Sequence, residues 1–461
     1  MGILEHLRGR RYAVLGLGRT GTAAAHFLTR MGAEVWCWDD SDTARKRAWE
    51  QGITLHELGG MRDWDSIACL VVSPGIPFLY PQPHPIVNTA LRAGVPLDND
   101  IGLYFSNLQQ MSHLPTTVAV TGSNGKSTTA ALIHSILSHL KRLSRLVGNF
   151  GESVLAGDPI EPGETVVLEL SSYQGELARR LQPTIAVFLN FSEDHLDRHG
   201  GLGGYFAAKS RVFNMSLPQW SVVGVDEQEG HFLAAQCQSP RLVRISSSQD
   251  LSQFDDAVFT RDGNLVSRMH GQSTVICRLT DMPGLSGPHN HQNACAASAV
   301  CHALGLSNQE IAAGLCRFTG LPHRSQVVGR FNGILCINDS KATNAVSAGM
   351  ALEAFPRIRW IAGGLGKEGG ISILQNRLNN VIKAYLVGQS APEFAAQLGA
   401  TPHVICETVS RAVELAWGEA RNGETLLFSP AAASFDQYPD FEARGDHFVS
   451  EVKRCFARPE S

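Results

Sequence analysis

Short apolar runs of strand length alternate with helical segments along most of the chain. Runs of this kind occupy 12–15, 34–38 and 69–72, and a helical segment at 23–31 separates the first two. Parallel strands joined through helices produce this alternation, because each crossover helix covers one face of the sheet. The sequence therefore predicts an α/β fold built on doubly wound, mostly parallel sheets.

The alternation starts again twice farther along the chain. Strands are predicted at 117–120, 166–168 and 185–189, and then at 334–337, 360–362, 384–387 and 425–428. The polar stretch 106–115 is predicted to be the first linker, and Gly320 with Pro322 marks a second break. At about 150 residues per domain, 461 residues agree with three domains, for which we expect the limits 1–109, 110–320 and 321–461.

Composition and charge narrow the class of protein. Hydrophobic residues make up 43% of the chain, enough for several cores, and 39 Lys and Arg against 43 Asp and Glu leave a net charge of −4. We therefore expect no nucleic-acid partner and no membrane partner. No apolar run reaches the ~18 residues of a membrane span, and Met1 to Arg8 lack the apolar core of a signal peptide, so we expect a cytoplasmic protein.

Ten cysteines are scattered along the chain without a Cys-x-x-Cys pair. A disulfide framework or a zinc ribbon would need a regular pairing pattern. Free, mostly buried thiols in a reducing compartment are the better interpretation.

A glycine-rich turn, Gly-Leu-Gly-Arg-Thr-Gly at 16–21, follows the first predicted strand, and Asp39 ends the next one. Glycines let the backbone approach a diphosphate at a helix N-terminus, and a carboxylate about 20 residues farther on can bind a ribose. The motif alone is also compatible with a tight strand–helix turn. If it binds a ligand, NAD(P) and any other nucleotide diphosphate satisfy the same requirements.

A second loop, Thr-Gly-Ser-Asn-Gly-Lys-Ser-Thr at 121–128, lies between a predicted strand and a predicted helix. Its backbone N–H groups can surround phosphates, Lys126 can neutralise their charge, and the Ser127 hydroxyl can reach Mg²⁺. The loop departs from the general phosphate-binding pattern, because Val120 stands where that pattern has its first glycine. It nevertheless predicts a protein that uses ATP or GTP.

Further polar residues follow the neighbouring strands. Glu169 ends one strand, where it can hold Mg²⁺ or simply face solvent. The run 190–199 is rich in Asp and His and is a candidate ligand loop, with a solvated loop or a zinc site as alternatives. Zinc is disfavoured because no cysteine lies nearby. Asn290 and Asn293 open an Ala-rich helix predicted at 289–304; they can bind a nucleotide, or Asn290 can merely cap the helix.

Taken together and in this order, these motifs resemble the Mur ligase family. The resemblance covers nearly the whole chain and also rests on Phe441 and on the segments 73–76, 148–151, 205–211, 321–324, 338–344, 363–367, 429–438 and 444–446. It implies Rossmann-like N- and C-terminal domains on either side of a central P-loop ATPase-like domain. It also implies an ATP-dependent ligase, and it is closest to the members that add D-glutamate to UDP-N-acetylmuramoyl-L-alanine.

The resemblance also implies a role for each matching residue, with Lys126, His195 and Lys209 as the catalytic ones. The implied ATP-binding residues are Gly122, Ser123, Asn124, Gly125, Lys126, Ser127, Thr128, Asn293, Arg324, Asp339 and Lys341. The implied uridine-nucleotide site comprises Arg19, Thr20, Asp39, Ser73 and Asn149. The implied D-glutamate site comprises Thr343, Lys367, Ser434, Phe435 and Phe441.

Two Mg²⁺ sites are implied, formed by Ser127, Glu169, His195 and a Lys209 that CO₂ has carbamylated. Spacing alone does not distinguish Lys209 from a solvated helical lysine.

We expect a monomer whose substrates are ATP, D-glutamate and UDP-N-acetylmuramoyl-L-alanine. A nicotinamide dehydrogenase and a non-catalytic nucleotide-binding protein are the competing hypotheses. Glycines at 102, 175 and 370 depart from the usual family pattern.

Overall fold

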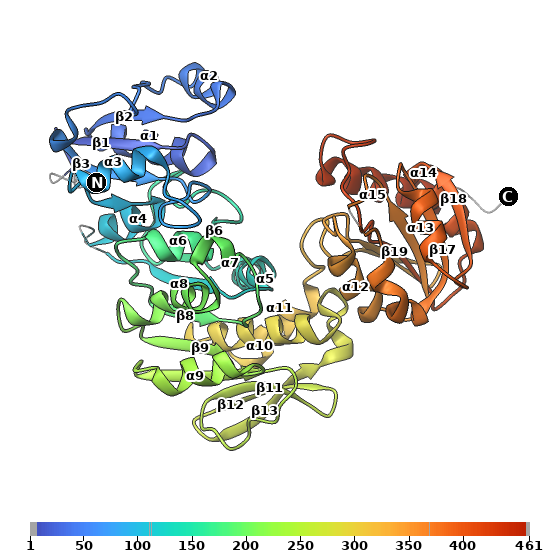
Figure 1. Ribbon diagram of the computed structural model, residues 1–461. Helices are drawn as coiled ribbons and strands as arrows, with labels where there is room; N and C mark the ends of the chain where they lie inside the picture. Colours follow the sequence, from blue (N-terminus) through green and yellow to red (C-terminus); the bar gives the residue numbers. More distant parts are fainter. Residues whose placement is uncertain (1–6, 110, 112, 368, 458–461) are drawn as a thin grey trace. The chain divides into compact units, whose positions relative to one another are not determined.

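The computed structural model describes residues 7–109, 111, 113–367 and 369–457 and divides into two compact units (Figure 1). Unit 1 spans the chain to residue 277 together with 292–314, and unit 2 spans 278–291 together with the chain from 315. Residues 110 and 112 of the predicted linker, and residues 1–6 of the N-terminal segment, lie outside the described residues. The linker prediction was wrong at its start, because a helix continues to Leu108.

The first sheet of unit 1 has four parallel strands in the order β2-β1-β3-β4. Its strands are β1 (Arg11–Leu15), β2 (Glu34–Trp38), β3 (Ile67–Val72) and β4 (Leu97–Asp98). The helices of this segment are α1 (Arg19–Arg30), α2 (Asp42–Glu50), α3 (Pro85–Arg92) and α4 (Asp100–Leu108), with a 3₁₀ turn at Trp64–Ser66.

The second sheet of unit 1 has nine strands in the order β13-β12-β11-β10-β9-β8-β5-β7-β6. They are β5 (Thr116–Thr121), β6 (Ser144–Gly148), β7 (Thr165–Glu169), β8 (Ile185–Phe188), β9 (Trp220–Gly224), β10 (Arg241–Ser246), β11 (Ala257–Arg261), β12 (Asn264–Met269) and β13 (Gln272–Arg278). The strands from β6 to β11 pair in parallel, whereas β12 runs antiparallel to β11.

Helices and 3₁₀ turns connect these strands and continue beyond them. They are α5 (Lys126–His139), α6 (Ser172–Leu177), α7 (Leu196–His199), α8 (Leu202–Asn214), α9 (Gln228–Gln236), Leu279–Asp281, Pro283–Leu285, α10 (Pro288–Ala303) and α11 (Asn308–Arg317). Strands β5, β7 and β8 are almost entirely buried, as expected for parallel strands that are covered on both faces.

Unit 2 contains the third sheet, of six strands in the order β14-β15-β19-β16-β17-β18. Its strands are β14 (Gln326–Phe331), β15 (Ile334–Asn338), β16 (Ile358–Gly363), β17 (Val381–Val387), β18 (His403–Glu407) and β19 (Thr425–Phe428). Its helices are α12 (Ala345–Ala354), α13 (Ala391–Gln397), α14 (Val409–Glu419) and α15 (Phe441–Ala457), with a 3₁₀ helix at Ser372–Asn380. Only β14 pairs antiparallel to its neighbour among these described strands.

The predicted α/β class with mostly parallel sheets is confirmed. The antiparallel strands β12 and β14 were not predicted, and the domain limits at 109 and 320 stay a prediction.

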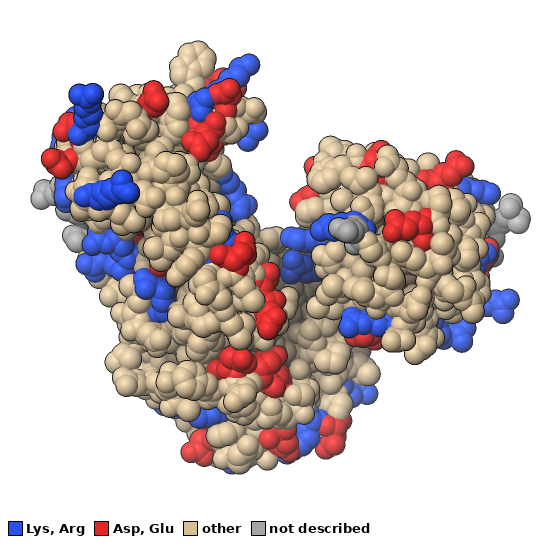
Figure 2. All heavy atoms as spheres, in the orientation of Figure 1, with Lys and Arg blue, Asp and Glu red and all other residues tan. Residues whose placement is uncertain are grey.

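Figure 2 shows acidic and basic side chains interspersed over the visible face, in keeping with the near balance of 39 Lys and Arg against 43 Asp and Glu. No helix of the described residues is long and apolar enough to cross a membrane. Each of the ten cysteines is a free thiol and most are buried.

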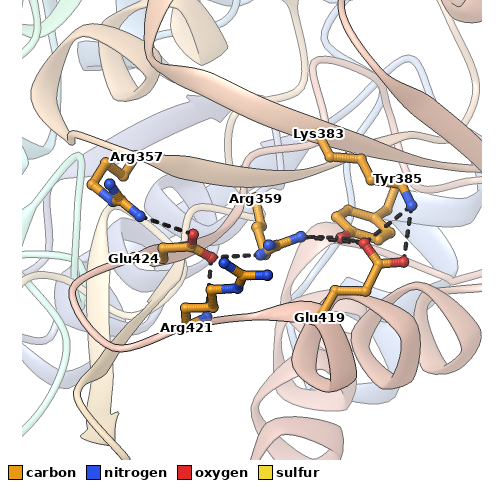
Figure 3. Close-up of polar contacts among 7 residues, drawn as sticks. All are labelled: Arg357, Arg359, Lys383, Tyr385, Glu419, Arg421 and Glu424. Atoms are coloured by element: carbon orange, nitrogen blue, oxygen red, sulfur yellow. Dashed lines mark hydrogen bonds and ion pairs between the residues drawn. The ribbon is translucent and has the colours of Figure 1, made fainter.

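A buried ionic network joins strands β16 and β17 to helix α14 and to the segment before β19 in unit 2 (Figure 3). The guanidinium of Arg359 donates to Glu424 at 2.6 Å and to the Tyr385 hydroxyl at 2.8 Å, and it lies 3.2 Å from Glu419. Lys383 pairs with the same Glu419 at 2.8 Å. The side chains of Arg359 and Glu424 are 8% and 3% exposed, so their charges depend on each other rather than on water.

Replacing Glu424 by Gln is expected to lower the free energy of unfolding by about 3 kcal/mol, because it leaves the buried Arg359 guanidinium short of its nearest carboxylate. Urea unfolding followed by tryptophan fluorescence measures the change. The control is Arg411→Gln, which breaks the exposed pair of Arg411 with Glu414 and should cost about 0.5 kcal/mol or less. Equal effects of the two substitutions would contradict the prediction.

Candidate active site

The loop between β5 and α5 is the glycine-rich segment 121–128 predicted to bind phosphates. Gly122 and Gly125 both have positive φ angles, of 145° and 81°. Position 125 also lacks room for a side chain, since a Cβ there would lie 2.1 Å from Oδ1 of Asn293. Glycine is therefore required here on two grounds, and it lets the chain turn directly into the N-terminus of α5, where backbone N–H groups favour an anion.

Two lysines meet at one backbone carbonyl of this loop. Nζ of Lys126 donates to the Gly122 oxygen at 2.9 Å and to the Ser123 oxygen at 2.7 Å. Nζ of Lys209, which comes from α8, donates to the same Gly122 oxygen at 2.7 Å. The structure thus brings together two residues that lie 83 positions apart in the sequence.

Lys209 is only 2% exposed. No carboxylate in the described part of the chain forms an ion pair with it, and its Nζ lies 4.2 Å from the centre of the Tyr205 ring. Burial, together with the charge of Lys126, lowers the pKa of Lys209 to about 6, although the charge of Asp194 opposes the shift. At neutral pH the Lys209 side chain is therefore mainly an uncharged amine.

Glu169, at the end of β7, presents an unpaired carboxylate oxygen. Its side chain is 2% exposed, and Oε1 accepts a hydrogen bond from Nδ2 of Asn149 at 3.1 Å. Oε2 is buried without a hydrogen-bond partner, and so is the Thr121 hydroxyl at the end of β5. Buried polar atoms without partners are uncommon in proteins, and such an oxygen is a suitable ligand for a divalent cation.

A cation at this edge of the sheet would also need ligands other than carboxylate and imidazole groups, such as hydroxyl oxygens, water and phosphate oxygens. Ser127 is the second residue of α5, and its side chain is buried. Among the described residues there is no group of three His, Cys, Asp or Glu that could hold a metal ion. The oxygens of Ser127 and Glu169 fit Mg²⁺, which takes few protein ligands and completes its shell with water and phosphate oxygens.

Tyr205 connects the remaining parts of the site. Its hydroxyl lies 3.2 Å from the Ser123 hydroxyl in the loop, and its ring centre lies 6.3 Å from that of His195. His195 has a positive φ of 52°, and its side chain is 46% exposed and 3.4 Å from Asp194. The loop, the buried lysine and the exposed imidazole therefore surround one aromatic ring.

Asn293 of α10 accepts a hydrogen bond from the Thr129 hydroxyl at 3.1 Å, which places it beside the loop. Asn290 has a different position. Helix α10 begins at Pro288, and Nδ2 of Asn290 donates to the Ser286 carbonyl at 3.0 Å. The interpretation of Asn290 as the helix cap was therefore wrong, because the helix starts two residues earlier.

The first glycine-rich turn opens onto a pocket of about 480 Å³ lined by Gly16, Gly18, Thr20, Asp39 and Ser73, among others. Asp39 accepts hydrogen bonds from the backbone N–H groups of Leu17 and Ser41, at 2.6 and 2.8 Å. A Cβ at position 21 would lie 1.8 Å from the Gly16 oxygen, so this glycine allows α1 to begin against the turn. Asp39 thus stabilises the turn itself as well as facing the pocket.

Arg19 does not line this pocket. Its guanidinium donates to the backbone oxygens of Asn149 and Gly151, at 2.8 and 2.7 Å. Because Asn149 also donates to Glu169, a short series of contacts connects the glycine-rich turn of the first sheet with the carboxylate of the second.

Unit 2 carries the other predicted residues, most of them on loops that follow β15, β16 and β19. Arg324 lies before β14, and Phe441 is the first residue of α15. Asp339 is buried and accepts from the Ser325 N–H at 2.9 Å and the Ser429 hydroxyl at 2.7 Å; burial raises its pKa to about 6. The Lys341 ammonium lies 5.3 Å from the centre of the Phe441 ring. Carboxyl ends of parallel strands meet at one edge of a sheet, the usual place for a ligand.

The other unit 2 positions differ in exposure. Arg324 and Thr343 are half-buried, Ser434 is buried, Lys367 is exposed, and the Phe435 side chain is 70% exposed.

Comparison with known proteins shows which family of enzymes this chain is related to. The chain is 55% identical to a UDP-N-acetylmuramoylalanine–D-glutamate ligase of Cereibacter sphaeroides, over 97% of this chain and 98% of that protein. The chain belongs to the Mur ligase family. The ligase of the same name from Roseobacter denitrificans is 54% identical over 98% of this chain and 99% of that protein. The family description "Mur ligase middle domain" matches residues 120–301.

Solved structures of the Mur ligase family share the fold. The MurF ligase of Thermotoga maritima, determined in complex with ADP, superimposes with a TM-score of 0.57 at 18% identity, over 97% of this chain and 95% of that one.

The three glycines that depart from the usual Mur ligase pattern have structural reasons. A Cβ at 102 would lie 1.8 Å from Oδ1 of the buried Asp98, and one at 175 would lie 2.8 Å from the Ala208 carbonyl on α8. Gly370 has a φ of 55° and faces Gln397. Gly175 therefore lets α6 lie close against the helix that carries Lys209.

The sequence analysis gave no individual role to Tyr205, Asn190 or Thr121, although each lies in a segment that it singled out (205–211, 190–199 and 121–128). The role of Asn190 depends on its hydrogen bond with the Asn124 N–H, which joins segments that are distant in sequence. The Thr121 hydroxyl is distinguished only by its burial without a partner.

Proposed function

We propose that this chain is an ATP-dependent ligase that adds D-glutamate to UDP-N-acetylmuramoyl-L-alanine, a step of peptidoglycan precursor synthesis. The observation that carries the proposal is the meeting of Lys126 and the buried Lys209 at the Gly122 carbonyl, beside a loop built for phosphates. Identity of 54–55% to D-glutamate ligases over nearly the whole chain supports the choice of substrates. We further propose a monomeric cytoplasmic enzyme, as expected from the sequence.

The reaction has two chemical steps. The free carboxylate of UDP-N-acetylmuramoyl-L-alanine attacks the γ-phosphorus of ATP, which gives an acyl phosphate and releases ADP. The amine of D-glutamate then attacks the acyl carbon, and the tetrahedral intermediate expels phosphate and loses a proton to form the amide. In the first step two anions approach each other, so a fixed positive charge stabilises the transition state more than the separated substrates. Lys126 supplies that charge from within the loop.

Oxygen ligands at the carboxyl edge of the second sheet fit Mg²⁺. Ser127 and Glu169 would hold one ion, and His195 with a carbamylated Lys209 would hold a second. Bound Mg²⁺ neutralises phosphate charge and orients the phosphate oxygens. The unpaired Oε2 of Glu169 supports the first site.

Carbamylation of Lys209 agrees with its surroundings. The lone pair of an uncharged amine attacks the carbon of CO₂, a C–N bond forms, and one proton is released to give an anionic carbamate. A pKa of about 6 leaves the amine uncharged at pH 7, and the modification changes a neutral side chain into an anionic oxygen ligand.

The remaining substrates occupy the other predicted residues. The uridine nucleotide binds at the glycine-rich turn. The pocket lined by Thr20, Asp39 and Ser73 supports this assignment. D-Glutamate binds at Thr343, Lys367, Ser434, Phe435 and Phe441 of unit 2, where a lysine and hydroxyl groups suit a dicarboxylate.

A phosphate-release assay with purified UDP-N-acetylmuramoyl-L-alanine and ATP tests the proposal. D-Glutamate is expected to support release at least about 100-fold faster than L-glutamate, L-lysine or diaminopimelate, because a site built for one set of hydrogen bonds leaves buried polar groups unpaired with another. Turnover with L-lysine or diaminopimelate instead would assign a different acceptor. Hydride exchange with NAD(P)H and no ATP turnover would favour the dehydrogenase hypothesis.

A further inference from the structure

A row of hydrogen-bonded side chains runs along the carboxyl edge of the second sheet and ends at the phosphate-binding loop. Its members follow the adjacent strands β10, β9, β8 and β5, and α10 contributes one side chain. Asp226 lies two residues after β9, Asn190 two residues after β8, and Gln292 in the first turns of α10. None of these three belongs to the residues assigned above to substrate, metal or catalysis.

The hydrogen bonds of this row form one continuous series. Nε2 of Gln292 donates to Oδ2 of Asp226 at 2.6 Å, and Nδ2 of Asn190 donates to Oε1 of Gln292 at 2.7 Å. Oδ1 of Asn190 then accepts from the backbone N–H of Asn124 at 2.8 Å, within the loop. The Asn190 carbonyl also accepts from the Ser123 N–H at 3.0 Å, so this residue fixes two successive loop positions.

The orientation of each side-chain amide in this series depends on Asp226, the residue with which the series begins. A side-chain amide has a donor end and an acceptor end, so either end can face a given neighbour, whereas a carboxylate only accepts. Hydrogen bonds from Ser246, Ser247 and Ser248 outweigh the effect of burial and lower the pKa of Asp226, which keeps it ionised. An ionised Asp226 obliges Gln292 to present its donor, and each following amide then has only one favourable orientation.

We propose that Asp226 is a positioning residue for ATP, because it sets the orientation of Gln292 and Asn190 and thereby holds an acceptor against the Asn124 N–H of the phosphate-binding loop. This inference rests on the proposed use of that loop for ATP. Gln292 is 4% exposed, so water does not substitute for either of its partners.

The test is to reverse the polarity of the series and then restore it. In Asp226→Asn, the oxygen of the new side chain keeps the Oδ1 position, where it accepts from the Ser246 and Ser248 hydroxyls and the Ser248 N–H. Its amide group then takes the Oδ2 position, faces Gln292 and donates to it, so Gln292 and Asn190 turn over and Asn190 offers a donor to the Asn124 N–H. Loss of this hydrogen bond is expected to raise the Kd of Mg-ATP about 10-fold, measured by calorimetric titration of the full chain. The KM of UDP-N-acetylmuramoyl-L-alanine should stay within about 2-fold, because Asp226 does not touch its site.

The double variant Asp226→Asn with Gln292→Glu has the same net charge as the original chain. The carboxylate introduced at position 292 accepts from both of its neighbours, so Asn190 returns to its original orientation and the Kd of Mg-ATP should recover to within about 3-fold. Ser248→Ala is the matched control: it removes a hydrogen bond to Oδ1 of Asp226 but leaves the one from Gln292 intact.

The outcomes separate a positioning role from a structural one. An unchanged Kd in Asp226→Asn would overturn the proposal, as would a folded double variant that fails to recover. An equal loss of affinity in Ser248→Ala would show that Asp226 only stabilises the turn at 246–248, which also overturns it. Failure of the unaltered chain to bind Mg-ATP would instead count against the proposed function.

Discussion

Lys126→Ala is expected to lower kcat by about 10³-fold or more, with a much smaller change in the KM of D-glutamate. The Lys126 ammonium lies within hydrogen-bond distance of the Gly122 and Ser123 carbonyls and is held by the loop itself. A fixed cation of this kind stabilises charge that develops during phosphoryl transfer, and removing one such group typically costs two to three orders of magnitude in rate. Steady-state phosphate release with saturating substrates measures the effect.

The matched control for this substitution is Lys46→Ala. Lys46 is an exposed residue of α2 in the same unit, so its loss removes one positive charge without touching the loop. Its kcat should stay within about 2-fold of the original. Comparable rates for Lys126→Ala and Lys46→Ala would refute the assignment of Lys126.

Lys209→Ala is expected to abolish ligation, and a small carboxylate such as acetate or formate in the buffer should restore part of the activity. The substitution removes the atom that CO₂ would modify and leaves a space beside Gly122 that an external carboxylate can occupy. Lys209→Met keeps the length of the side chain but fills that space, so it should remain inactive and should not respond to acetate. The contrast between the two variants separates the loss of a ligand from a loss of folding.

Carbamylation of Lys209 can also be followed without turnover. With ¹³C-labelled bicarbonate, the unaltered chain should give a carbamate NMR signal that Lys209→Met lacks. Because the pKa of Lys209 is lowered to about 6, the reactive amine is uncharged above that pH and protonated below it. The signal should therefore weaken as the pH falls through 6. Full activity of Lys209→Ala in acetate-free buffer, or an equal signal from Lys209→Met, would disprove the modification.

The parts of the candidate site that are contiguous in the sequence could be predicted from local patterns. The strand, glycines and helix start around Lys126 are contiguous, and Glu169 is the last residue of a buried strand, so both were found from position alone. The antiparallel strands β12 and β14 were missed because polar and charged residues interrupt their apolar runs, as in Asn-Leu-Val-Ser-Arg-Met and Gln-Val-Val-Gly-Arg-Phe. Their pairing is set by tertiary contacts rather than by periodicity.

Lys209 shows why the rest could not be predicted in this way. A lysine in a helix is usually solvated, and nothing in its spacing indicates that α8 turns it inward against the Gly122 carbonyl. Only the family resemblance pointed to it. The series from Asp226 to Asn124 is still less visible, because it depends on the order of strands in the sheet and on the rotation of α10.

The buried thiols determine which reagents can attack this chain. Burial raises the pKa of Cys37, Cys301 and Cys336 to about 12. It also raises the pKa of Cys69 and of Cys295 well above the usual value of a thiol. These five thiols are therefore protonated at neutral pH, whereas thiols react through the anion. Cys316 on α11 is exposed, and Cys237 and Cys277 are partly exposed. Alkylating probes and electrophilic inhibitors should therefore label Cys316 first and leave the buried thiols unmodified, so a fluorophore can be attached to this chain without removing the buried cysteines.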